Sequence, residues 1–381
     1  MIRLLLAAAL YEAGAFAPPT LSQPARPLSA LGAEVVVCGS TNNDLIVSGP
    51  RLPLAGETIT HDSFATCFGG KGANQAVQAA RMGADVSMVA KVGRDAFGAQ
   101  MMANFADCGV AAEFVTEAAA GEPTGCAMIT VGAAERTNTI VIVPGANAAL
   151  TASDVRASES AFAGAKVLLT QLEVPEATTL AALELFAAAS AAGGVSVLNT
   201  APVPPGGVPD ALLTACDVVC PNEVELALLV KRAAPIDTVV EAVGAARELL
   251  NRGSKRVLVT LGAKGALLVG TAGSVFVPAL TGVDAIDTTG AGDSFLGAWA
   301  ASVASGASPV AAMVAAGRVA AVTVSRAGTQ PSFPEKAAVD LDGAPVLDLN
   351  DLVLDGADAP QNDWVLRDDG TLAPLAKFSH V

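Results

Sequence analysis

Two patterns of apolar residues alternate along the chain. Short apolar runs rich in β-branched residues predict buried strands, and Ala-rich stretches with apolar residues every three or four positions predict helices. The predicted strands are 34–38, 86–92, 167–169, 195–198, 218–219 and 256–260. The predicted helices are 73–82, 96–108, 175–191, 222–231, 237–251, 291–305 and 309–324. Strands alternating with helices favour an α/β fold with a mostly parallel sheet covered on both faces.

Two stretches, 45–66 and 112–143, break this alternation. They contain strand patterns and turns but no helix long enough to cross over between parallel strands. The candidate strands are 45–47, 57–60, 126–130 and 139–143. We expect these strands to form a small separate sheet that acts as a lid over a cleft.

The two ends differ from the body of the chain. Residues 1–33 start with a cationic residue and a short apolar run, which is the form of a signal peptide. The Ala-Phe-Ala-Pro sequence at 15–18 resembles the junction in leaders of plastid proteins of algae with complex plastids. The alternatives are a disordered extension or a misassigned start codon. Residues 335–381 form an acidic tail, so the main domain is predicted at 34–334.

Composition excludes several classes of function. Hydrophobic residues make up 52% of the 381, enough for a large core. The net charge of −15 would repel nucleic acid. Only two histidines are present and no cysteines form a C-x-x-C pair, which disfavours a zinc site and a Ser-His-Asp hydrolase. Anionic ligands would need helix N-termini or a few placed cations.

The most informative motif is D-T-T-G-A-G-D-S-F at 287–295, where a predicted helix begins. The backbone N–H groups of Gly290, Ala291 and Gly292 would form an anion site at the helix N-terminus. Asp293, in the first turn, could take the proton of a substrate hydroxyl. Phosphoryl transfer to an alcohol requires such an anion site beside a base. A simple helix cap is the alternative.

Two further motifs contain groups suited to a sugar. G-G-K-G-A-N-Q at 69–75 begins a helix, and Lys71 and Asn74 in it suit a polyol. It is not a Walker A loop, because Gly follows the lysine where Ser or Thr would bind magnesium. After the first predicted strand, Asn42 and Asp44 suit paired hydrogen bonds to sugar hydroxyls. A turn-to-helix junction and an Asx turn are the respective alternatives.

A fourth motif suits a metal–phosphate group. Asn222 and Glu225 are three residues apart, so they share one face of a predicted helix. An amide and a carboxylate on one face suit a hydrated magnesium ion beside phosphates. Helix capping is the alternative.

In this order the motifs resemble those of the PfkB carbohydrate kinase family, and its ribokinase branch most closely. The similarity extends from about Glu34 to Phe333. The matching segments are 69–75 and 287–293 for the two family signatures, 222–225 for the magnesium motif, 260–265 for the nucleotide turn, and 328–332 for the ribokinase branch.

This resemblance implies a ribokinase-like three-layer α/β sandwich with a mostly parallel central sheet and a small β-sheet lid. It also implies ATP-dependent phosphorylation of D-ribose at O5 to give D-ribose 5-phosphate, with Mg²⁺ and with K⁺ as activator. A homodimer through the lid sheets is implied, with no nucleic-acid partner and no membrane association of the mature form. The family resemblance favours the cytoplasm, whereas the leader favours a plastid.

The resemblance also implies roles for individual residues. The expected catalytic residues are Asp293 as base and the N–H groups of Gly290, Ala291 and Gly292. The expected ribose site contains Asn42, Asn43, Asp44, Gly70, Lys71, Gly72, Ala73, Asn74, Glu173 and Asp293. The expected nucleotide site contains Asn222, Glu225, Thr260, Leu261, Gly262, Ala263, Lys264, Gly265, Gly292, Asp293 and Gly317. The expected cation site contains Asp287, Thr289, Thr323, Arg326, Gly328 and Ser332.

One position departs from the family pattern, because Gly317 stands where relatives often have Asn or His near the adenine. The alternative functions are another PfkB kinase, such as a fructokinase, deoxyribokinase or adenosine kinase, and a non-catalytic sugar-binding regulator. Asp293 and the Gly-Ala-Gly sequence argue against a regulator. A dinucleotide-dependent dehydrogenase is disfavoured because no G-x-G-x-x-G follows the first strand.

Overall fold

The computed structural model describes residues 32–341 except 133, 135, 136 and 272, together with the backbone of 364–366 and 372–374. Most of the leader predicted at 1–33 and most of the acidic tail predicted at 335–381 lie outside the described residues.

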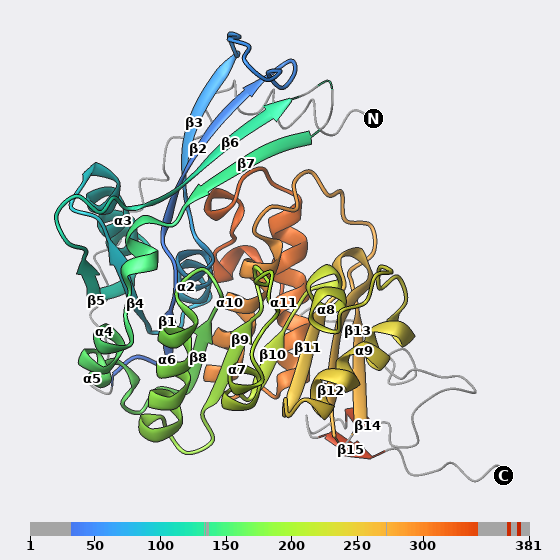
Figure 1. Ribbon diagram of the computed structural model, residues 1–381. Helices are drawn as coiled ribbons and strands as arrows, with labels where there is room; N and C mark the ends of the chain where they lie inside the picture. The colour runs from blue at the N-terminus through green and yellow to red at the C-terminus, as the bar shows by residue number, and fades with distance from the viewer. Residues whose placement is uncertain are drawn as a thin grey trace.

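The main sheet has nine strands in the order β13-β12-β11-β10-β9-β8-β1-β4-β5. Neighbours from β11 through β5 run parallel, whereas β12 and β13 run antiparallel at one edge. The strands are β1 (Val35–Cys38), β4 (Val86–Val92), β5 (Val110–Glu117), β8 (Val167–Thr170), β9 (Val195–Asn199), β10 (Val218–Cys220), β11 (Arg256–Thr260), β12 (Gly265–Gly270) and β13 (Gly273–Pro278). The predicted, mostly parallel sheet is therefore confirmed (Figure 1).

Helices cover both faces of this sheet. They are α2 (Lys71–Arg81), α3 (Ala96–Asp107), α4 (Ala152–Ala157), α5 (Glu159–Phe162), α6 (Glu176–Ala189), α7 (Asp210–Ala215), α8 (Glu223–Leu229), α9 (Val239–Asn251), α10 (Ala291–Ala304) and α11 (Pro309–Val324). All seven helices predicted from periodicity are present, with ends shifted by at most two residues, and the short α4, α5 and α7 were not predicted.

The side chains of β1 divide the core into two halves, because successive residues of a strand point to opposite faces. Val35 and Val37 pack into the cluster that includes α2, α3, α10 and α11. Val36 and Cys38 pack into the cluster that includes α4 to α9. The fold is thus a three-layer sandwich. In Figure 1 the strands of its central sheet lie side by side, from β5 at the left to β13 at the right.

A second sheet of four strands forms the predicted lid, in the order β3-β2-β6-β7. Its strands are β2 (Asn42–Gly49), β3 (Ser63–Gly69), β6 (Gly125–Gly132) and β7 (Thr137–Val143). In Figure 1 this sheet projects from the upper end of the main sheet. Because β2 follows β1 after three residues, the lid begins at the carboxyl edge of the main sheet.

One predicted lid strand was wrong, and the stretch 112–143 assigned to the lid region began too early. Residues 57–60 form no strand, because the chain turns at Gly56 (φ 77°) and the Glu57 carboxylate accepts hydrogen bonds from Arg51 and from the Leu54 amide, which closes a loop at the lid tip. The strand lies further on, as β3. Residues 112–117 belong to β5, not to the lid, because α3 is long enough to return the chain parallel to β4.

Among the described residues, no helix has both the length and the apolar character needed to cross a bilayer. All six cysteines lie in the described part of the chain, and each is a free thiol.

Gly297 lets α10 pack directly on α2, and this generates the first prediction. A Cβ at Gly297 would lie 2.6 Å from the Gln75 carbonyl oxygen and 3.0 Å from the Ala79 nitrogen, both backbone atoms. We expect Gly297→Ala to lower the free energy of unfolding by about 1–3 kcal/mol in urea titrations, because two helices must separate.

The control is Gly244→Ala in the exposed face of α9, where a Cβ would meet no atom within 4 Å. There the higher helix propensity of Ala should raise stability by up to about 1 kcal/mol. Equal changes in the free energy of unfolding for the two variants would show that the α2–α10 contact does not require glycine at position 297.

Candidate active site

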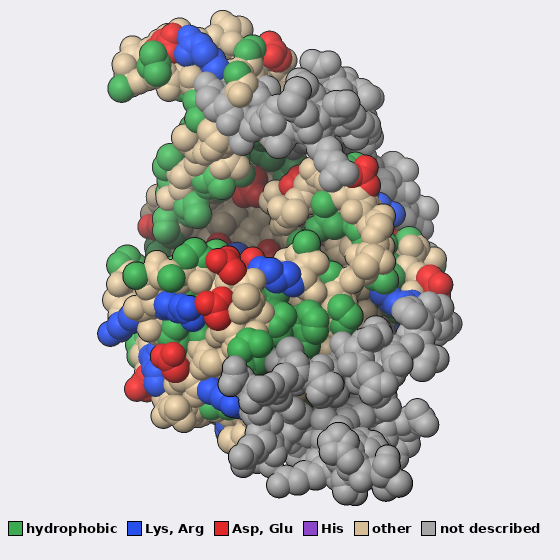
Figure 2. All heavy atoms as spheres, turned by 90° about the vertical axis from the view of Figure 1, so that its right-hand side faces the viewer, with side chains coloured by type: hydrophobic (Ala, Val, Ile, Leu, Met, Phe, Trp, Pro, Cys, Tyr) green, Lys and Arg blue, Asp and Glu red, His purple; other side chains and the backbone are tan. Residues whose placement is uncertain are grey.

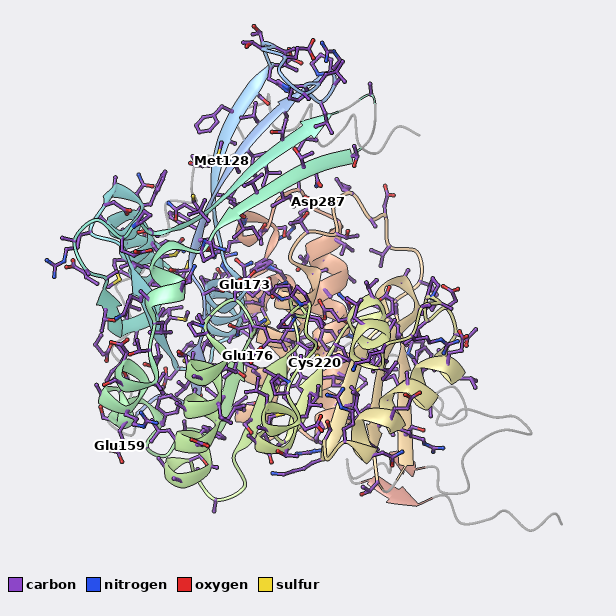
Figure 3. The ribbon with its side chains drawn as sticks, in the orientation of Figure 1. Met128, Glu159, Glu173, Glu176, Cys220 and Asp287 are labelled. Carbon is purple, nitrogen blue, oxygen red and sulfur yellow. The ribbon has the colours of Figure 1, made fainter. Side chains whose placement is uncertain are left out.

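The polar motifs meet at the carboxyl edge of the main sheet, beneath the lid. Figure 2 shows the molecule hollowed between lid and main body, with acidic side chains visible inside. In Figure 3, Glu173 lies at the upper end of the main body, and Met128 lies above it on the lid. The pocket between the sheet edge and α10 is lined by Lys71, Asn199, Ala201, Cys220, Asn222, Glu225, Thr260, Thr288, Gly290, Ala291, Gly292, Asp293 and Leu296.

Asp293 lies in the first turn of α10 and is only 7% exposed. Its Oδ2 accepts a hydrogen bond from Asn74 Nδ2 (2.9 Å), and its Oδ1 accepts one from Gln75 Nε2 (3.0 Å). Each carboxylate oxygen retains a second lone pair. The predicted base is therefore held firmly in the pocket wall.

The start of α10 is open toward this pocket. Gly290 adopts φ 75°, and a Cβ there would approach Thr329 Cγ2 to 2.8 Å, so the sharp turn requires glycine. A Cβ at Gly292 would meet nothing within 4 Å. The Ala291 N–H donates to the Thr288 carbonyl (3.2 Å), so of the three predicted N–H groups this one is already engaged.

Glu173 organises the end of the site nearest the lid. Its Oε2 accepts hydrogen bonds from Ser40 Oγ (2.5 Å) and from the Lys71 backbone N–H (2.9 Å). The Ser40 hydroxyl also accepts one from the Gly72 N–H (3.2 Å). Gly70 and Gly72 lie tightly against residues 39–42, where a Cβ on either would overlap backbone atoms. These two glycines therefore shape the site, and the buried Ala73 packs into the core.

Strand β2 begins with Asn42, Asn43 and Asp44, and it places them on two different faces of the lid sheet. Asn42 and Asp44 share one face, and Asn42 Oδ1 accepts a hydrogen bond from Asn147 Nδ2 (2.8 Å). Asn43 points to the opposite face, where its amide donates to Gln100 on α3 (3.5 Å). The structure therefore does not bring Asn43 to the sugar end of the site.

Carboxylates dominate the electrostatics. Burial would lower the pKa of Lys71, but Asp293, Glu173 and Glu225 outweigh this effect and the pKa is raised. Burial, followed by the charges of Glu173 and Asp293, raises the pKa of Asp44 to about 7. Burial also raises the pKa of Glu225, although the Asn222 N–H and Lys71 oppose this. Lys71 is therefore a cation shared among acidic groups.

The opposite end of the pocket contains the 222–225 motif. Asn222 Oδ1 accepts a hydrogen bond from the Glu225 N–H (2.8 Å), and Glu225 Oε2 accepts one from the Asn222 N–H (2.9 Å). This is a capping box for α8, so the capping alternative is confirmed. Both side chains nevertheless line the pocket, and capping leaves Glu225 Oε1 available to it.

The predicted nucleotide turn lies next to this motif. Thr260 bridges to Asn222 and lines the pocket. Gly262, Ala263 and Lys264 are exposed, and Gly265 (φ 130°) is a position where a Cβ would overlap the Val277 carbonyl oxygen. Leu261 is buried in the core, so only its backbone is available to a ligand. On α11, a Cβ at Gly317 would meet nothing within 4 Å.

The predicted cation site lies where two loops are tied together. Asp287 Oδ1 accepts hydrogen bonds from the Thr289 N–H and hydroxyl, and Oδ2 accepts one from the Gly328 N–H (2.9 Å). Thr323 and Ser332 are buried, with their hydroxyls bonded to the Val319 and Thr329 carbonyl oxygens. Arg326 is exposed. Figure 3 shows Asp287 on its loop, away from Glu173.

Comparison with known proteins agrees with this geometry. Residues 33–336 match the model of the pfkB family of carbohydrate kinases. The chain is 40% identical over 324 residues to a ribokinase of Mus musculus, covering 84% of this chain and 98% of that protein.

The chain belongs to the pfkB family of carbohydrate kinases.

Other members of the pfkB family are also similar. A deoxyribokinase of Salmonella typhi is 36% identical over 302 residues, covering 79% of this chain and 95% of that one. The structure of Arabidopsis thaliana ribokinase complexed with ribose and ATP superposes with a TM-score of 0.71 at 31% identity, covering 81% of this chain and 97% of that chain. These similarities confirm the predicted fold class.

Sequence motifs missed several residues of this pfkB site. Ser40, Gln75 and Asn147 contact predicted site residues, and Asn199 and Thr288 line the pocket. Asn199 carries a signal that could have found it, because it is the polar residue directly after the predicted strand 195–198. Ser40 and Gln75 lie inside recognised motifs, but their roles depend on partners far along the chain.

The raised pKa of Asp44 generates a prediction for stability. Between about pH 4 and pH 7 the unfolded chain releases the Asp44 proton while the folded chain retains it, so ionisation costs stability as the pH rises through this window. Asp44→Asn removes that cost. In urea titrations, we expect the variant to gain stability relative to the parent from pH 4 to pH 7, by at most about 4 kcal/mol, and to hold that gain above pH 7.

Asp62→Asn, at an exposed position before β3, controls for the loss of one negative charge. A stability difference between parent and Asp44→Asn that is constant across this pH range would contradict the raised pKa.

Proposed function

We propose that the chain transfers the γ-phosphoryl group of ATP to O5 of D-ribose and produces D-ribose 5-phosphate. The observation that carries the proposal is the place of Asp293. Its carboxylate stands at the open N-terminus of α10 and lines the pocket together with Asn222 at the phosphate-type end. The Asp293 charge also acts on Asp44, which belongs with Asn42 and Glu173 to the sugar-type end. The ribose and ATP named for the Arabidopsis structure support the same pair of substrates.

In this mechanism the chain's own groups hold and deprotonate the acceptor hydroxyl. Asp293 removes the proton as O5 attacks the γ-phosphorus in line, a contribution of about 10² to 10⁴ in rate. The bond from the γ-phosphorus to the β,γ-bridging oxygen breaks on the opposite side, and ADP leaves. The N-terminus of α10, with the open Gly292 N–H, stabilises the charge that develops on the transferred group. Lys71 adds a positive charge beside Asp293 and Glu173.

Mg²⁺ and K⁺ belong to the same proposal. Several carboxylates surround one lysine, so a polyphosphate would be repelled without a divalent cation, and Glu225 Oε1 with the Asn222 amide provides oxygen ligands suited to hydrated Mg²⁺. Such an ion neutralises charge on the phosphates. The loops that Asp287 joins contain many carbonyl and hydroxyl oxygen atoms, which are the kind of ligands that suit K⁺. Among the described residues, no three His, Cys, Asp or Glu side chains form a metal cluster.

The test is ADP release by the chain without residues 1–33, with Mg²⁺-ATP and D-ribose, with and without K⁺. We expect ribose-dependent release, faster with K⁺, and a loss of about 10² to 10⁴ in kcat for Asp293→Asn. Asp237→Asn, an exposed aspartate before α9, is the matched control and should match the parent.

Parallel assays with 2-deoxyribose, fructose and adenosine decide the acceptor. The deoxyribokinase relative makes 2-deoxyribose the second candidate. A higher kcat/KM for another acceptor than for ribose would support the proposed phosphoryl transfer but show that ribose is not the preferred acceptor. Sugar binding without turnover of any acceptor would contradict the enzyme and favour a sugar-binding regulator.

A homodimer through the lid is the proposed assembly. Strand β7 lies at the edge of the lid, and all its residues are exposed. Met128 and Val141 pair on one face, and Ile140 lies on the other, with Ile140 52% and Val141 61% exposed. Apolar side chains exposed on both faces of a small sheet are typical of an interface.

Single charges on each lid face test this assembly. One of the variants Ile140→Lys and Val141→Lys places a charge on the lid face that the dimer buries. We expect that variant to sediment as a monomer in analytical ultracentrifugation. Val240→Lys on α9, where Val240 is equally exposed at 61%, should leave the dimer unchanged. A parent that sediments as a monomer would contradict the proposal, as would a dimer that both lid variants leave intact. The cellular compartment stays a prediction, for which the family resemblance favours the cytoplasm and residues 1–33 favour a plastid.

A further inference from the structure

Two chains of side-chain amides run head to tail into the Asp293 carboxylate. In the first, Gln171 Nε2 donates to Gln75 Oε1 (2.8 Å), and Gln75 Nε2 donates to Asp293 Oδ1 (3.0 Å). In the second, Gln330 Nε2 donates to Asn74 Oδ1 (3.0 Å), and Asn74 Nδ2 donates to Asp293 Oδ2 (2.9 Å). Each amide thus presents its NH₂ group toward the carboxylate.

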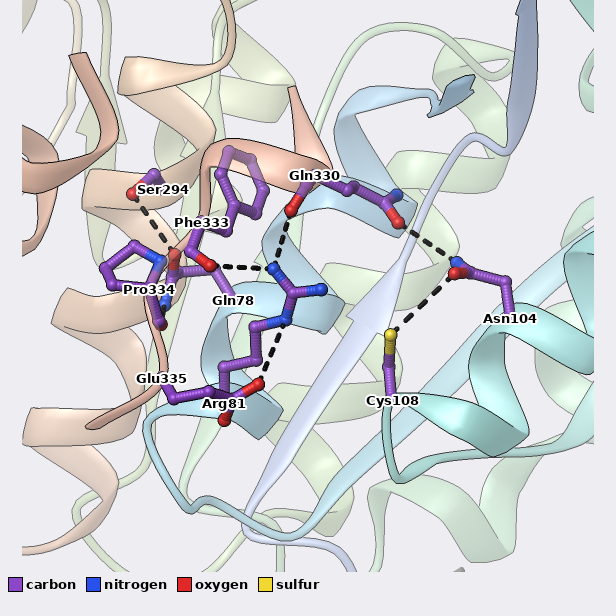
Figure 4. A network of polar contacts seen from close by, with 9 residues as sticks. All are labelled: Gln78, Arg81, Asn104, Cys108, Ser294, Gln330, Phe333, Pro334 and Glu335. Carbon is purple, nitrogen blue, oxygen red and sulfur yellow. Dashed lines mark hydrogen bonds and ion pairs between the residues drawn. The ribbon is translucent and has the colours of Figure 1, made fainter. Parts of the chain in front are cut away.

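The second chain continues on the far side of α2. Asn104 Nδ2 on α3 donates to Gln330 Oε1 (3.0 Å), and the Cys108 thiol donates to Asn104 Oδ1 (3.8 Å). Figure 4 shows this outer part, with Gln330 between Asn104 and the Arg81 guanidinium. Arg81 donates to the Gln330 carbonyl oxygen (2.6 Å) and so holds the backbone that carries the amide.

The carboxylate sets the direction of both chains. An ionised carboxylate only accepts hydrogen bonds, so Gln75 and Asn74 must turn their NH₂ groups toward it. Their oxygens then face outward and require donors from Gln171 and Gln330. The Gln75 NH₂ also donates to Asn199 Oδ1 (3.1 Å), which favours the same direction. At one end the arrangement leaves Gln171 Oε1 buried without a partner, beside Gly39. That orphaned oxygen is the cost of keeping the Gln171 NH₂ on Gln75.

Burial keeps the hydrogen bonds of the amide chains in this direction. Gln75 and Gln171 have 0% exposed surface, Gln330 has 3% and Asn74 has 4%, so water cannot replace a lost partner. Amide groups in such chains polarise one another. The amides therefore determine which lone pairs of Asp293 face the pocket.

We propose that Gln75 and Asn74, oriented from behind by Gln171 and Gln330, are positioning residues that aim the Asp293 carboxylate at the acceptor hydroxyl. The proposal rests on the phosphoryl transfer proposed above. Gln171 and Gln330 act on Asp293 only through the intervening amides. A base misplaced by about 1 Å costs about 10² in rate, which sets the expected scale.

The test is a set of methionine substitutions, because Met has nearly the shape of Gln without its donors. We expect Gln75→Met to lower kcat about 10- to 100-fold with KM for sugar and ATP within about threefold, and Gln171→Met to lower kcat about 3- to 10-fold. Gln78→Met is the matched control. Gln78 lies one turn along α2 and is fully buried. It donates to the Pro334 carbonyl oxygen (3.0 Å) and accepts from the Ser294 hydroxyl (3.2 Å), as Figure 4 shows, so it has buried partners but no hydrogen bond to the Asp293 carboxylate. It should lose stability but keep kcat within about threefold.

A double-mutant cycle separates positioning from a structural role. If Gln75 acts through the carboxylate, adding Gln75→Met to Asp293→Asn should change the residual kcat less than twofold. Multiplicative losses in the double variant would overturn the proposal. So would a kcat loss at Gln78→Met equal to that at Gln75→Met.

A readout independent of turnover keeps the two proposals distinguishable. The chain has seven glutamines, so side-chain ¹⁵N-glutamine labelling gives a simple amide spectrum. In Asp293→Asn, we expect the amide signals of Gln75 and Gln171 to shift while that of Gln78 stays. Unchanged Gln75 and Gln171 signals would overturn the amide chains themselves. Shifted signals in a parent that releases no ADP with any acceptor would leave the hydrogen bonds in place and reject both the kinase function and the positioning role.

Discussion

Helix α2 approaches α10 so closely at Gly297 that a methyl group there would overlap the Gln75 carbonyl oxygen. This contact places the amides of Asn74 and Gln75 on the two oxygens of Asp293. The N-terminus of α2 also contributes Lys71, whose backbone N–H binds Glu173. The sugar-type groups, the base and the open start of α10 therefore depend on the packing of these two helices.

The electrostatics of the site follow from the same packing. The chain carries a net charge of −15, and its pocket gathers carboxylates around a single lysine. Asp44 responds to this environment with a pKa of about 7, because burial and two neighbouring carboxylates disfavour its charge. Positive potential for an anion comes mainly from the α10 N-terminus and Lys71. An acidic protein thus binds an anion through local dipoles rather than through its overall charge.

Local signals explain which elements the sequence predicted well. The helices of the main domain carry continuous apolar periodicity and begin at good caps, such as Asp95 for α3 and Thr238 for α9. The segment 57–60 has a strand-like composition, but it follows a glycine turn that the Arg51–Glu57 contact holds closed. These residues therefore do not pair with a neighbouring strand. Strands β12 and β13 were missed because neither alternates buried and exposed positions, and four consecutive residues of β12 are buried.

The sequence by itself determined the three-layer α/β class, the family and the identity of Asp293, because period, caps and glycine-rich helix starts are local properties. Only the tertiary structure decided that Asn43 points away from Asp44 and that Gln75 serves Asp293. Those outcomes depend on Gln100, which folding brings to Asn43, and on Gln171, which folding brings to Gln75. Hydrogen-bond direction in a buried network is set by all its members together, and some of these members lie more than 200 residues apart.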